Sequence, residues 1–302
     1  MSPLVAAWAA DYEKRAGVQI SYSPVGSGAG IQAITHREVD FGASDAPLTP
    51  DQAKAADGVL QIPWALAATV LAYHVDGLKN QLKLNGPLVA DIFLGKVTKW
   101  NDPAIAKLNP GVSLPATDIT PVFRIDSSGD TYAFTDYLSK ISPEWKSKVG
   151  AATQVSFPAG VVGRGNSGVA GAVTRADGGI GYLAIAYVFE SNLDYVLVEN
   201  AAGKFPVPGI PSISAAGKTV TSLPPSNTVS ITNPPASAPD AYPISTFTYA
   251  LVPQQSPKAS TLKPFLTYAI GDGQALGRQY QFAPLPPVVV SAGKDAIAKI
   301  HP

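Results

Sequence analysis

The sequence contains no cysteine, and this absence excludes several kinds of chemistry at once. Without thiols the chain can form no disulfide, and it has no cysteine nucleophile and no thiolate ligand for a metal ion. Histidine is also scarce, with three residues in 302, and no two of them stand at the spacing of a ligand pair. We therefore expect neither a metal site nor a bound cofactor.

Charge of either sign is low and balanced. The 22 lysines and arginines are matched by 22 aspartates and glutamates, so the formal net charge is zero. This balance gives no electrostatic reason to expect a nucleic-acid partner or an acidic membrane surface. No apolar run approaches the roughly 20 residues that a membrane span needs. The first residues show neither the basic nor the apolar region of a signal peptide, so none is expected within this sequence.

Glycine and proline are plentiful, with 27 and 28 residues, while apolar runs recur along the whole chain. This combination indicates a compact, loop-rich, exported protein rather than a disordered one. Short strand-like runs alternate with helical patterns from about residue 18 to residue 73 and again in the middle of the chain. Such alternation predicts an α/β fold built on a parallel sheet, and 302 residues suffice for one large domain or two ordinary ones.

The most informative stretch is a polar turn in the middle of the sequence. Residues 119–123 form an apolar run that predicts a buried strand, and the run ends at Arg124, just before a cluster of small polar residues that opens a helix. Free N–H groups and the positive end of the helix dipole make such a turn suitable for an anion, and Arg124 adds a charged fork. The alternative is that Ser127 or Ser128 only caps the helix while Arg124 pairs with Asp126.

Two turns nearer the beginning have a similar form. Residues 24–31 follow an alternating segment at residues 18–22, which predicts a strand, and they open a helix with Ser27 at its expected N-cap. The glycines match neither the dinucleotide fingerprint nor the P-loop. Residues 39–48 predict a short strand running into a turn that carries the carboxylate of Asp45, and residues 49–52 have the form of a capping box.

Together the three turns resemble the periplasmic phosphate-binding proteins of bacterial phosphate ABC transporters, which are type II periplasmic binding proteins. The resemblance covers essentially the whole chain from residue 3. Its motifs follow in order at residues 26–30, 40–48, 91–102, 124–131, 179–182 and 282–286. The resemblance implies an α/β, two-domain Venus-flytrap fold in which the chain crosses twice at the hinge.

The expected first domain is discontinuous, because it takes residues 1–72 together with residues 247–302. The expected second domain takes residues 73–246 and includes a proline- and serine-rich surface excursion at about residues 203–240. The two crossings are expected near residues 72–74 and near residues 245–250.

The resemblance also implies which residues bind phosphate and what each one does. Ser27 and Ser128 are expected to donate from their hydroxyl groups, Gly129 from its backbone N–H and Arg124 from its guanidinium. The full expected set consists of the ligands Ser27, Asp45, Arg124, Ser128, Gly129 and Asp130, with Gly26, Asp126 and Thr131 in support.

The two carboxylates of this set have distinct expected roles. An ionised carboxylate only accepts hydrogen bonds, so Asp45 favours an anion that carries a proton, as phosphate does at neutral pH and sulfate does not. The alternative is that Asp45 caps the turn before Pro47. For Asp130 we hypothesise that it accepts the second proton of monobasic phosphate, and the alternative is an acid stabilised by the helix dipole.

The beginning of the chain departs from the family pattern. Family members begin with a strand and a turn rich in glycine and alanine before the first helix, whereas here the sequence predicts that helix from about residue 3. The missing strand would be central to the sheet, so its loss would leave buried backbone unpaired. We therefore expect a gap beside residues 18–22 that residues missing from the start or another peptide would fill.

The resemblance implies high-affinity binding of inorganic phosphate and its delivery to the permease and ATPase subunits of an ABC importer. A monomer in the periplasm or another extracytoplasmic space, with no enzymatic activity, is expected. One alternative is a phosphatase-like hydrolase, against which stand the lack of a Gly-x-Ser-x-Gly elbow and of any histidine in the anion motifs. Another is a surface or scaffold protein that keeps the fold with weakened or lost binding.

Overall fold

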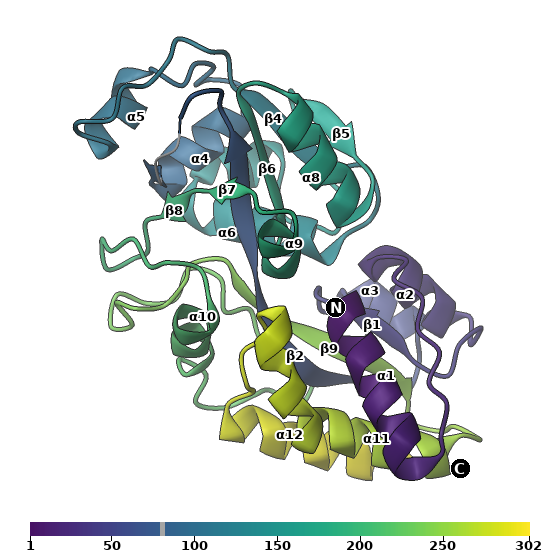
Figure 1. Cartoon of the computed structure of the whole chain (residues 1–302). Coiled ribbons are helices and arrows are strands. Elements are labelled where there is room, and N and C mark those ends of the chain that lie inside the picture. Colours follow the sequence, from purple (N-terminus) through teal and green to yellow (C-terminus); the bar gives the residue numbers. More distant parts are fainter. Residues whose placement is uncertain (79–81) are drawn as a thin grey trace.

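In the computed structural model, which describes residues 1–78 and 82–302, the chain forms two lobes, and one long strand runs through both (Figure 1). This strand is β2 (Val59–His74). From Val59 to Ala68 it pairs antiparallel with β9 (Ser245–Pro253), and from Thr69 to His74 it pairs antiparallel with β6 (Gly179–Ala184). The partner of β2 therefore changes between Ala68 and Thr69, where the chain passes from one lobe to the other.

The main sheet is mixed, with the strand order β1-β9-β2-β6-β4-β5 and with β7 also paired to β2. The other strands of this sheet are β1 (Gly42–Ser44), β4 (Thr120–Arg124), β5 (Val161–Gly163) and β7 (Asp194–Tyr195). Two further strands, β3 (Lys83–Leu84) and β8 (Leu197–Val198), form a small parallel pair of their own. Only β4 makes parallel pairs in the main sheet, with β5 and β6. The expected parallel sheet is thus wrong for the first lobe, where β9 returns from the far end of the sequence and runs against both β1 and β2.

Helices cover both halves of this sheet (Figure 1). One lobe carries α1 (Ser2–Ala16), α2 (Ser27–Thr35), α3 (Pro50–Ala55), α11 (Ala259–Ile270), the 3-10 helix η1 (Asp272–Tyr280) and α12 (Pro287–Ala298). The other carries α4 (Gly86–Phe93), α5 (Pro103–Leu108), α6 (Gly129–Ile141), α7 (Pro143–Lys148), α8 (Gly165–Arg175) and α9 (Ile185–Glu190). No helix in the described ranges combines the length and apolar character that a membrane crossing takes.

The predicted excursion at residues 203–240 contains one helix, α10 (Ile210–Gly217), which packs against β2 and β9. The remainder of this range, all of it described, consists of turns and extended loop.

Local sequence signals account for where several helices begin. The predicted capping box is present at α3, because the Thr49 side chain accepts from the Gln52 N–H while the Gln52 side chain accepts from the Thr49 N–H. Such reciprocal bonds satisfy N–H donors that the first turn of a helix otherwise leaves free. At α6 the Ser128 hydroxyl accepts from the Asp130 N–H at 3.1 Å, so Ser128 is the N-cap there.

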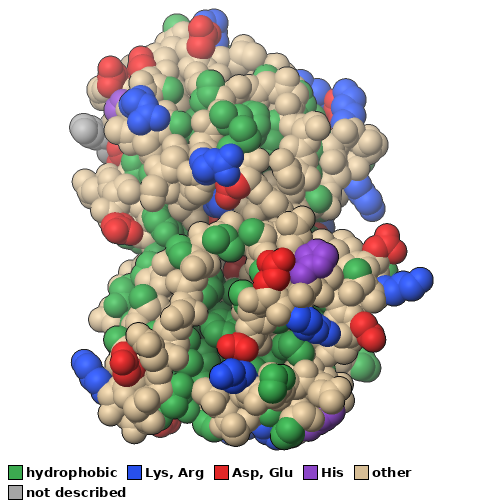
Figure 2. Space-filling view, turned by 90° about the vertical axis from the view of Figure 1, so that its right-hand side faces the viewer, with side chains coloured by type: hydrophobic (Ala, Val, Ile, Leu, Met, Phe, Trp, Pro, Cys, Tyr) green, Lys and Arg blue, Asp and Glu red, His purple; other side chains and the backbone are tan. Residues whose placement is uncertain are grey.

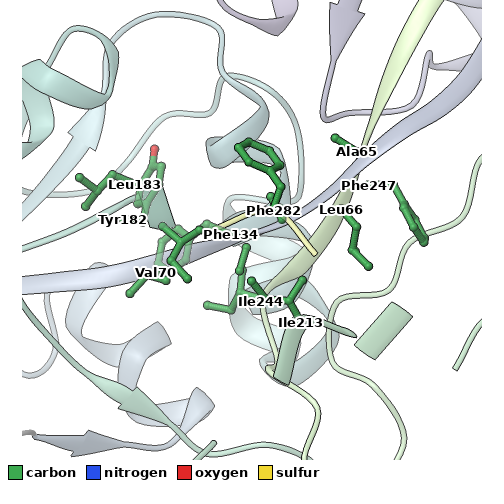
Figure 3. Packing of buried hydrophobic residues seen from close by; sticks show 14 of the residues in the cluster. Ala65, Leu66, Val70, Phe134, Tyr182, Leu183, Ile213, Ile244, Phe247 and Phe282 are labelled. Carbon is green, nitrogen blue, oxygen red and sulfur yellow. The ribbon is translucent and has the colours of Figure 1, made fainter. Parts of the chain in front are cut away.

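One continuous apolar core runs along β2 through both lobes. Figure 3 shows Leu66 near Phe247 at one end of this cluster and Val70 near Phe134 and Tyr182 at the other. All four tryptophans are fully buried in this core. Because the core is shared, the two lobes are held by apolar packing as well as by the backbone of β2.

The strand predicted at residues 18–22 is absent, and that prediction is wrong. These residues form no regular element and pair with no strand, and β1 pairs only with β9 among the described strands. A cavity of about 380 Å³, lined by residues 21–23 and 38–43 among others, lies between this segment and the start of β1. An alternating segment becomes a strand only where another edge offers hydrogen bonds, and no described residue offers one here.

Candidate functional site

The three polar turns identified in the sequence meet at one cavity between the lobes. Its volume is about 290 Å³. The described residues that line it include all six predicted ligands, namely Ser27 and Asp45 from the first lobe with Arg124, Ser128, Gly129 and Asp130 from the second, and also Gly26. Asp45 and Arg124 thus share one crevice. Figure 2 shows the narrow middle of the molecule between the two lobes.

On the first lobe, α2 brings Ser27 to the cavity. Gly26 is the N-cap of this helix, with φ at 92°, and Ser27 is its first residue. The predicted N-cap role of Ser27 is therefore wrong, and the hydroxyl oxygen of Ser27 instead accepts from the Asp45 N–H at 3.2 Å. This bond ties the first and second polar turns together, and it leaves the hydroxyl proton of Ser27 available as a donor.

On the second lobe, Arg124 is the last residue of β4 and its side chain is 6% exposed. Its Nε donates to Asp126 Oδ1 at 2.9 Å, its Nη2 donates to Asp126 Oδ2, and its Nη1 donates to Asp130 Oδ2 at 3.4 Å. A guanidinium has five N–H groups, so two remain without a partner among the described residues. They are the donors that a bound anion would use.

Asp126 holds this arginine in place. Burial raises the pKa of the Asp126 carboxyl, but hydrogen bonds from Arg124 and from the Gly165 N–H outweigh burial and lower that pKa to about 2. The same pairing raises the pKa of Arg124, although burial opposes the charge. Asp126 therefore stays ionised and fixes the orientation of the guanidinium, as expected of a supporting residue.

Asp130 is buried at the start of α6 and already has three protein donors. Thr69 donates to Oδ1 at 2.9 Å, while Asn166 donates to Oδ2 at 3.1 Å beside the Arg124 ion pair. A carboxylate offers about four acceptor positions, so little capacity remains for a ligand. Thr69 lies where β2 changes its partner. Asp130 therefore also connects the polar turn at residues 124–131 to the point where β2 passes from one lobe to the other.

A layer below the cavity keeps the end of β4 in place. The Tyr182 hydroxyl accepts from the Arg124 N–H at 3.2 Å and shares a hydrogen bond of 2.8 Å with Thr131. The ring of Tyr182 stacks on Phe134 with centroids 4.5 Å apart. Thr131 therefore acts through Tyr182 and does not line the cavity.

Asp45 faces the second lobe and is held by Thr248. Its Oδ1 accepts from the Thr248 hydroxyl. Burial raises the pKa of the Asp45 carboxyl most and the nearby charge of Asp130 raises it further, whereas the amino group of Met1, the Thr248 hydroxyl and Arg124 act in the opposite direction. A raised pKa makes the carboxylate a stronger acceptor for a proton carried by a ligand.

The two lobes touch where glycines leave room for the opposite turn. A Cβ on Gly28 would lie 2.1 Å from Ser127 Oγ and 2.4 Å from Ser127 Cβ, and a Cβ on Gly129 would lie 2.3 Å from Asp45 Oδ2. The Gly28 N–H also donates to the Ser127 carbonyl at 3.4 Å. Only residues without a side chain allow this approach, so the glycines are needed for the closed arrangement.

Sequence reasoning did not single out Thr69, Thr248, Asn166 and Arg164, which hold or line the site. Both threonines lie inside long buried strands, where nothing local marks a polar residue as functional. Asn166 and Arg164 belong to the small-residue turn that opens α8, and this turn was the available signal. Across residues 1–78 and 82–302, no three histidine or acidic side chains are placed to hold a metal ion.

The fold and this cavity define a two-lobed binding protein with a polar site between its lobes. The chain belongs to the PBP superfamily, because a family model described as PBP superfamily domain matches residues 1–272.

Known relatives and solved structures agree with this class. The chain is 41% identical over 294 residues to a Phosphate-binding protein PstS from Xylella fastidiosa, with 95% of this chain and 80% of the relative covered. It is 38% identical over 293 residues to the protein of that name from Pasteurella multocida, with coverage of 95% and 84%. In fold it matches a high affinity periplasmic phosphate-binding protein (PfluDING) bound with phosphate, at a TM-score of 0.76, 19% identity and coverage of 98% and 91%.

The Asp126 ion pair predicts a definite dependence of stability on pH. Its folded pKa of about 2 is below the usual 3.8, so the pair stabilises the fold fully above 3.8 and this contribution is lost as the pH falls through about 2. Asp126→Asn is expected to lower the free energy of unfolding by about 2 kcal/mol at neutral pH, and by less as the pH falls. Denaturant titrations at several pH values measure this difference.

The matched control is Asp118→Asn, because Asp118 pairs with Lys99 on the surface and its side chain is 78% exposed. That variant is expected to change stability by less than about 1 kcal/mol at any pH. Equal effects of the two substitutions at neutral pH would contradict the assigned role of Asp126.

The contact between Gly28 and Ser127 predicts that one methyl group added at Gly28 forces the lobes apart. Gly28→Ala places a Cβ inside the Ser127 side chain, so the lobes must move apart or accept strain of about 1–3 kcal/mol. We expect a larger radius of gyration in small-angle X-ray scattering and a lower melting temperature.

The double variant Gly28→Ala with Ser127→Gly removes both clashing atoms and is expected to regain the compact form. Ser127→Gly alone serves as its control, since it also loses the hydrogen bond from Ser127 to Thr153. A Gly28→Ala protein as compact as the wild type would show that the lobes do not meet in this way in solution.

Proposed function

We propose that this protein binds inorganic phosphate in the cavity between its lobes and delivers it to an ABC importer. The observation that carries the proposal is the pairing of opposite chemistries in one cavity: Arg124 offers two free N–H donors, and Asp45 offers a carboxylate acceptor. An anion that fits both must carry negative charge and a proton. Phosphate meets this requirement at neutral pH, whereas sulfate does not.

The relatives support the same ligand. Relatives named Phosphate-binding protein PstS from four bacterial strains share 36–41% identity with this chain over most of its length. The proposed phosphate ligands are Ser27, Arg124, Ser128 and the Gly129 N–H as donors, with Asp45 as acceptor. Gly26, Asp126 and Thr131 support them through the contacts described above.

The proposed partners are the permease and ATPase subunits of a phosphate ABC transporter, and the proposed location is the periplasm or an equivalent extracytoplasmic space. A monomer suffices, because both halves of the site come from one chain.

Binding without hydrolysis is proposed because, among the described residues, no serine hydroxyl that lines the cavity is hydrogen-bonded to a histidine or to a carboxylate that could act as its base. No histidine is among the described residues that line it, and the Ser128 hydroxyl accepts from the Asp130 N–H without a hydrogen bond to any carboxylate of that part of the chain. Hydrolysis of a chromogenic phosphate ester that Ser128→Ala abolishes would support the alternative of a phosphatase. A scaffold protein without binding is separated from both by isothermal titration calorimetry with phosphate.

Asp45 provides the sharpest test of selectivity. Asp45→Asn replaces an acceptor by an amide that can donate, so phosphate affinity is expected to fall by about 1–3 kcal/mol, which is roughly 5- to 100-fold in Kd. Sulfate carries no proton to lose, so its binding is expected to fall less or to improve. Calorimetry with each anion gives the ratio of the two constants.

Asp40→Asn is the matched control, because Asp40 lies on the same stretch of sequence but is exposed and outside the site cavity. It is expected to leave both constants unchanged. A phosphate-to-sulfate ratio that Asp45→Asn leaves unaltered would refute the proton-reading role.

The role of Asp130 stays a hypothesis with its own test. Asp130 retains about one free acceptor position, with which it could accept the second proton of monobasic phosphate. In that case the wild type keeps its affinity from about pH 8 to about pH 5, while Asp130→Thr loses affinity at the acidic end. Identical profiles for the two proteins would leave Asp130 as an anchor for Arg124 alone.

A further inference from the structure

The site holds more acid than base in its interior. The buried cluster consists of one guanidinium and two carboxylates, because Arg124 is paired with both Asp126 and Asp130. Asp45 adds a third carboxyl on the opposite wall, and the amino group of Met1, which also lines the cavity, acts on Asp45 as one further positive charge, so three carboxyls of the described chain face two cations there. A bound anion can still be held there by hydrogen bonds, but the interior offers no surplus positive charge to attract it from solution.

A second arginine stands at the edge of the same cavity. Of the lysine and arginine side chains in the described part of the chain, only Arg124 and Arg164 line the cavity. Arg164 is exposed, and it also lines a neighbouring cavity that spans Val25 on one lobe and Ile125 on the other. It is therefore at the mouth, between the site and the outer surface of the cleft.

The Arg164 side chain has no hydrogen bond or ion pair among residues 1–78 and 82–302, unlike that of Arg124. Asp126 is the acidic residue among the described residues that line this neighbouring cavity, and its oxygens already accept from Arg124 and from the Gly165 N–H. The charge of Arg164 is thus left uncompensated beside the anion site.

The backbone that carries this arginine is fixed to the site. Arg164 is the N-cap residue of α8, Gly165 bonds to Asp126, and Asn166 donates to Asp130 while it accepts from the Ala184 N–H at 2.9 Å. The two residues after Arg164 are therefore bonded to the same acids that orient Arg124. This fixes the position of the Arg164 backbone relative to the buried guanidinium of Arg124.

We propose that Arg164 is the capture residue of the site: its guanidinium attracts the anion at the mouth and speeds association, while the buried groups hold the anion afterwards. The proposal rests on the proposed binding of phosphate. A free cation at the rim of an acid-rich cavity raises the local concentration of an anion, and this effect acts on association more than on dissociation.

The test compares Arg164→Gln with Arg175→Gln. Arg175 is exposed at the other end of α8 and does not line the cavity, so both variants lose one charge from the same helix. Calorimetry gives Kd at low and high ionic strength, and a chase of bound radiolabelled phosphate with unlabelled phosphate gives the dissociation rate. The association rate is the ratio of the dissociation rate to Kd.

We expect Arg164→Gln to slow association about three- to tenfold at low ionic strength, with an unchanged dissociation rate and a smaller difference at high salt. Arg164→Glu is expected to enlarge the effect, and Arg175→Gln to match the wild type. Association by Arg164→Gln that equals that of Arg175→Gln overturns the proposal. A faster dissociation with unchanged association also overturns it, because Arg164 would then hold the bound anion. Wild-type protein that binds no phosphate at all overturns the proposed function itself.

Discussion

The ion pairs of Arg124 with Asp126 and Asp130 are the interaction on which the rest of the site depends. A guanidinium that is 6% exposed cannot stay buried without counter-charges, and two carboxylates from the same turn provide them. These acids also fix which N–H groups of the fork remain free. The strand end, the helix start and the α8 turn are each tied to one of the two acids, so the geometry of the anion site follows from this cluster.

The same cluster is coupled to the connection between the lobes. Asp130 accepts from Thr69, the first residue of β2 that pairs with β6 rather than β9. Any rotation of the lobes about this point would act on β2, whose Thr69 side chain is hydrogen-bonded to Asp130 in the polar turn at residues 124–131. The Gly28 contact with Ser127 then limits how closely the lobes approach. The turn that holds the arginine is therefore hydrogen-bonded to the strand that runs through both lobes.

Much of the site could be predicted because its residues cluster in short polar turns that follow apolar strands. Arg124, Ser128 and Asp45 each occupy such a turn, where a helix start or a loose carboxylate has a recognisable local pattern. Thr69 and Thr248 could not be found in this way, because their roles arise from strands that meet only in the folded chain.

The fold was predictable in its class but less so in its pairing. Local periodicity identified the α/β alternation, yet it cannot show that β9 returns from the far end of the sequence to run against β1 and β2. The alternating segment at residues 18–22 failed for the same reason. Periodicity reports a preference for an extended backbone, whereas a strand also requires a neighbouring edge, and that requirement is not local.

The charge distribution explains how an acid-rich cavity can still suit an anion. Binding there has to come from directed N–H and O–H donors, because the net charge of Arg124 with its two acids is already negative. Directed donors discriminate between anions by geometry and by protons, whereas a surplus of positive charge would attract every anion alike. Such a design gains selectivity at the expense of long-range attraction. An exposed arginine without an acidic partner at the rim, outside the groups that discriminate, restores attraction without weakening selectivity, and Arg164 occupies that position.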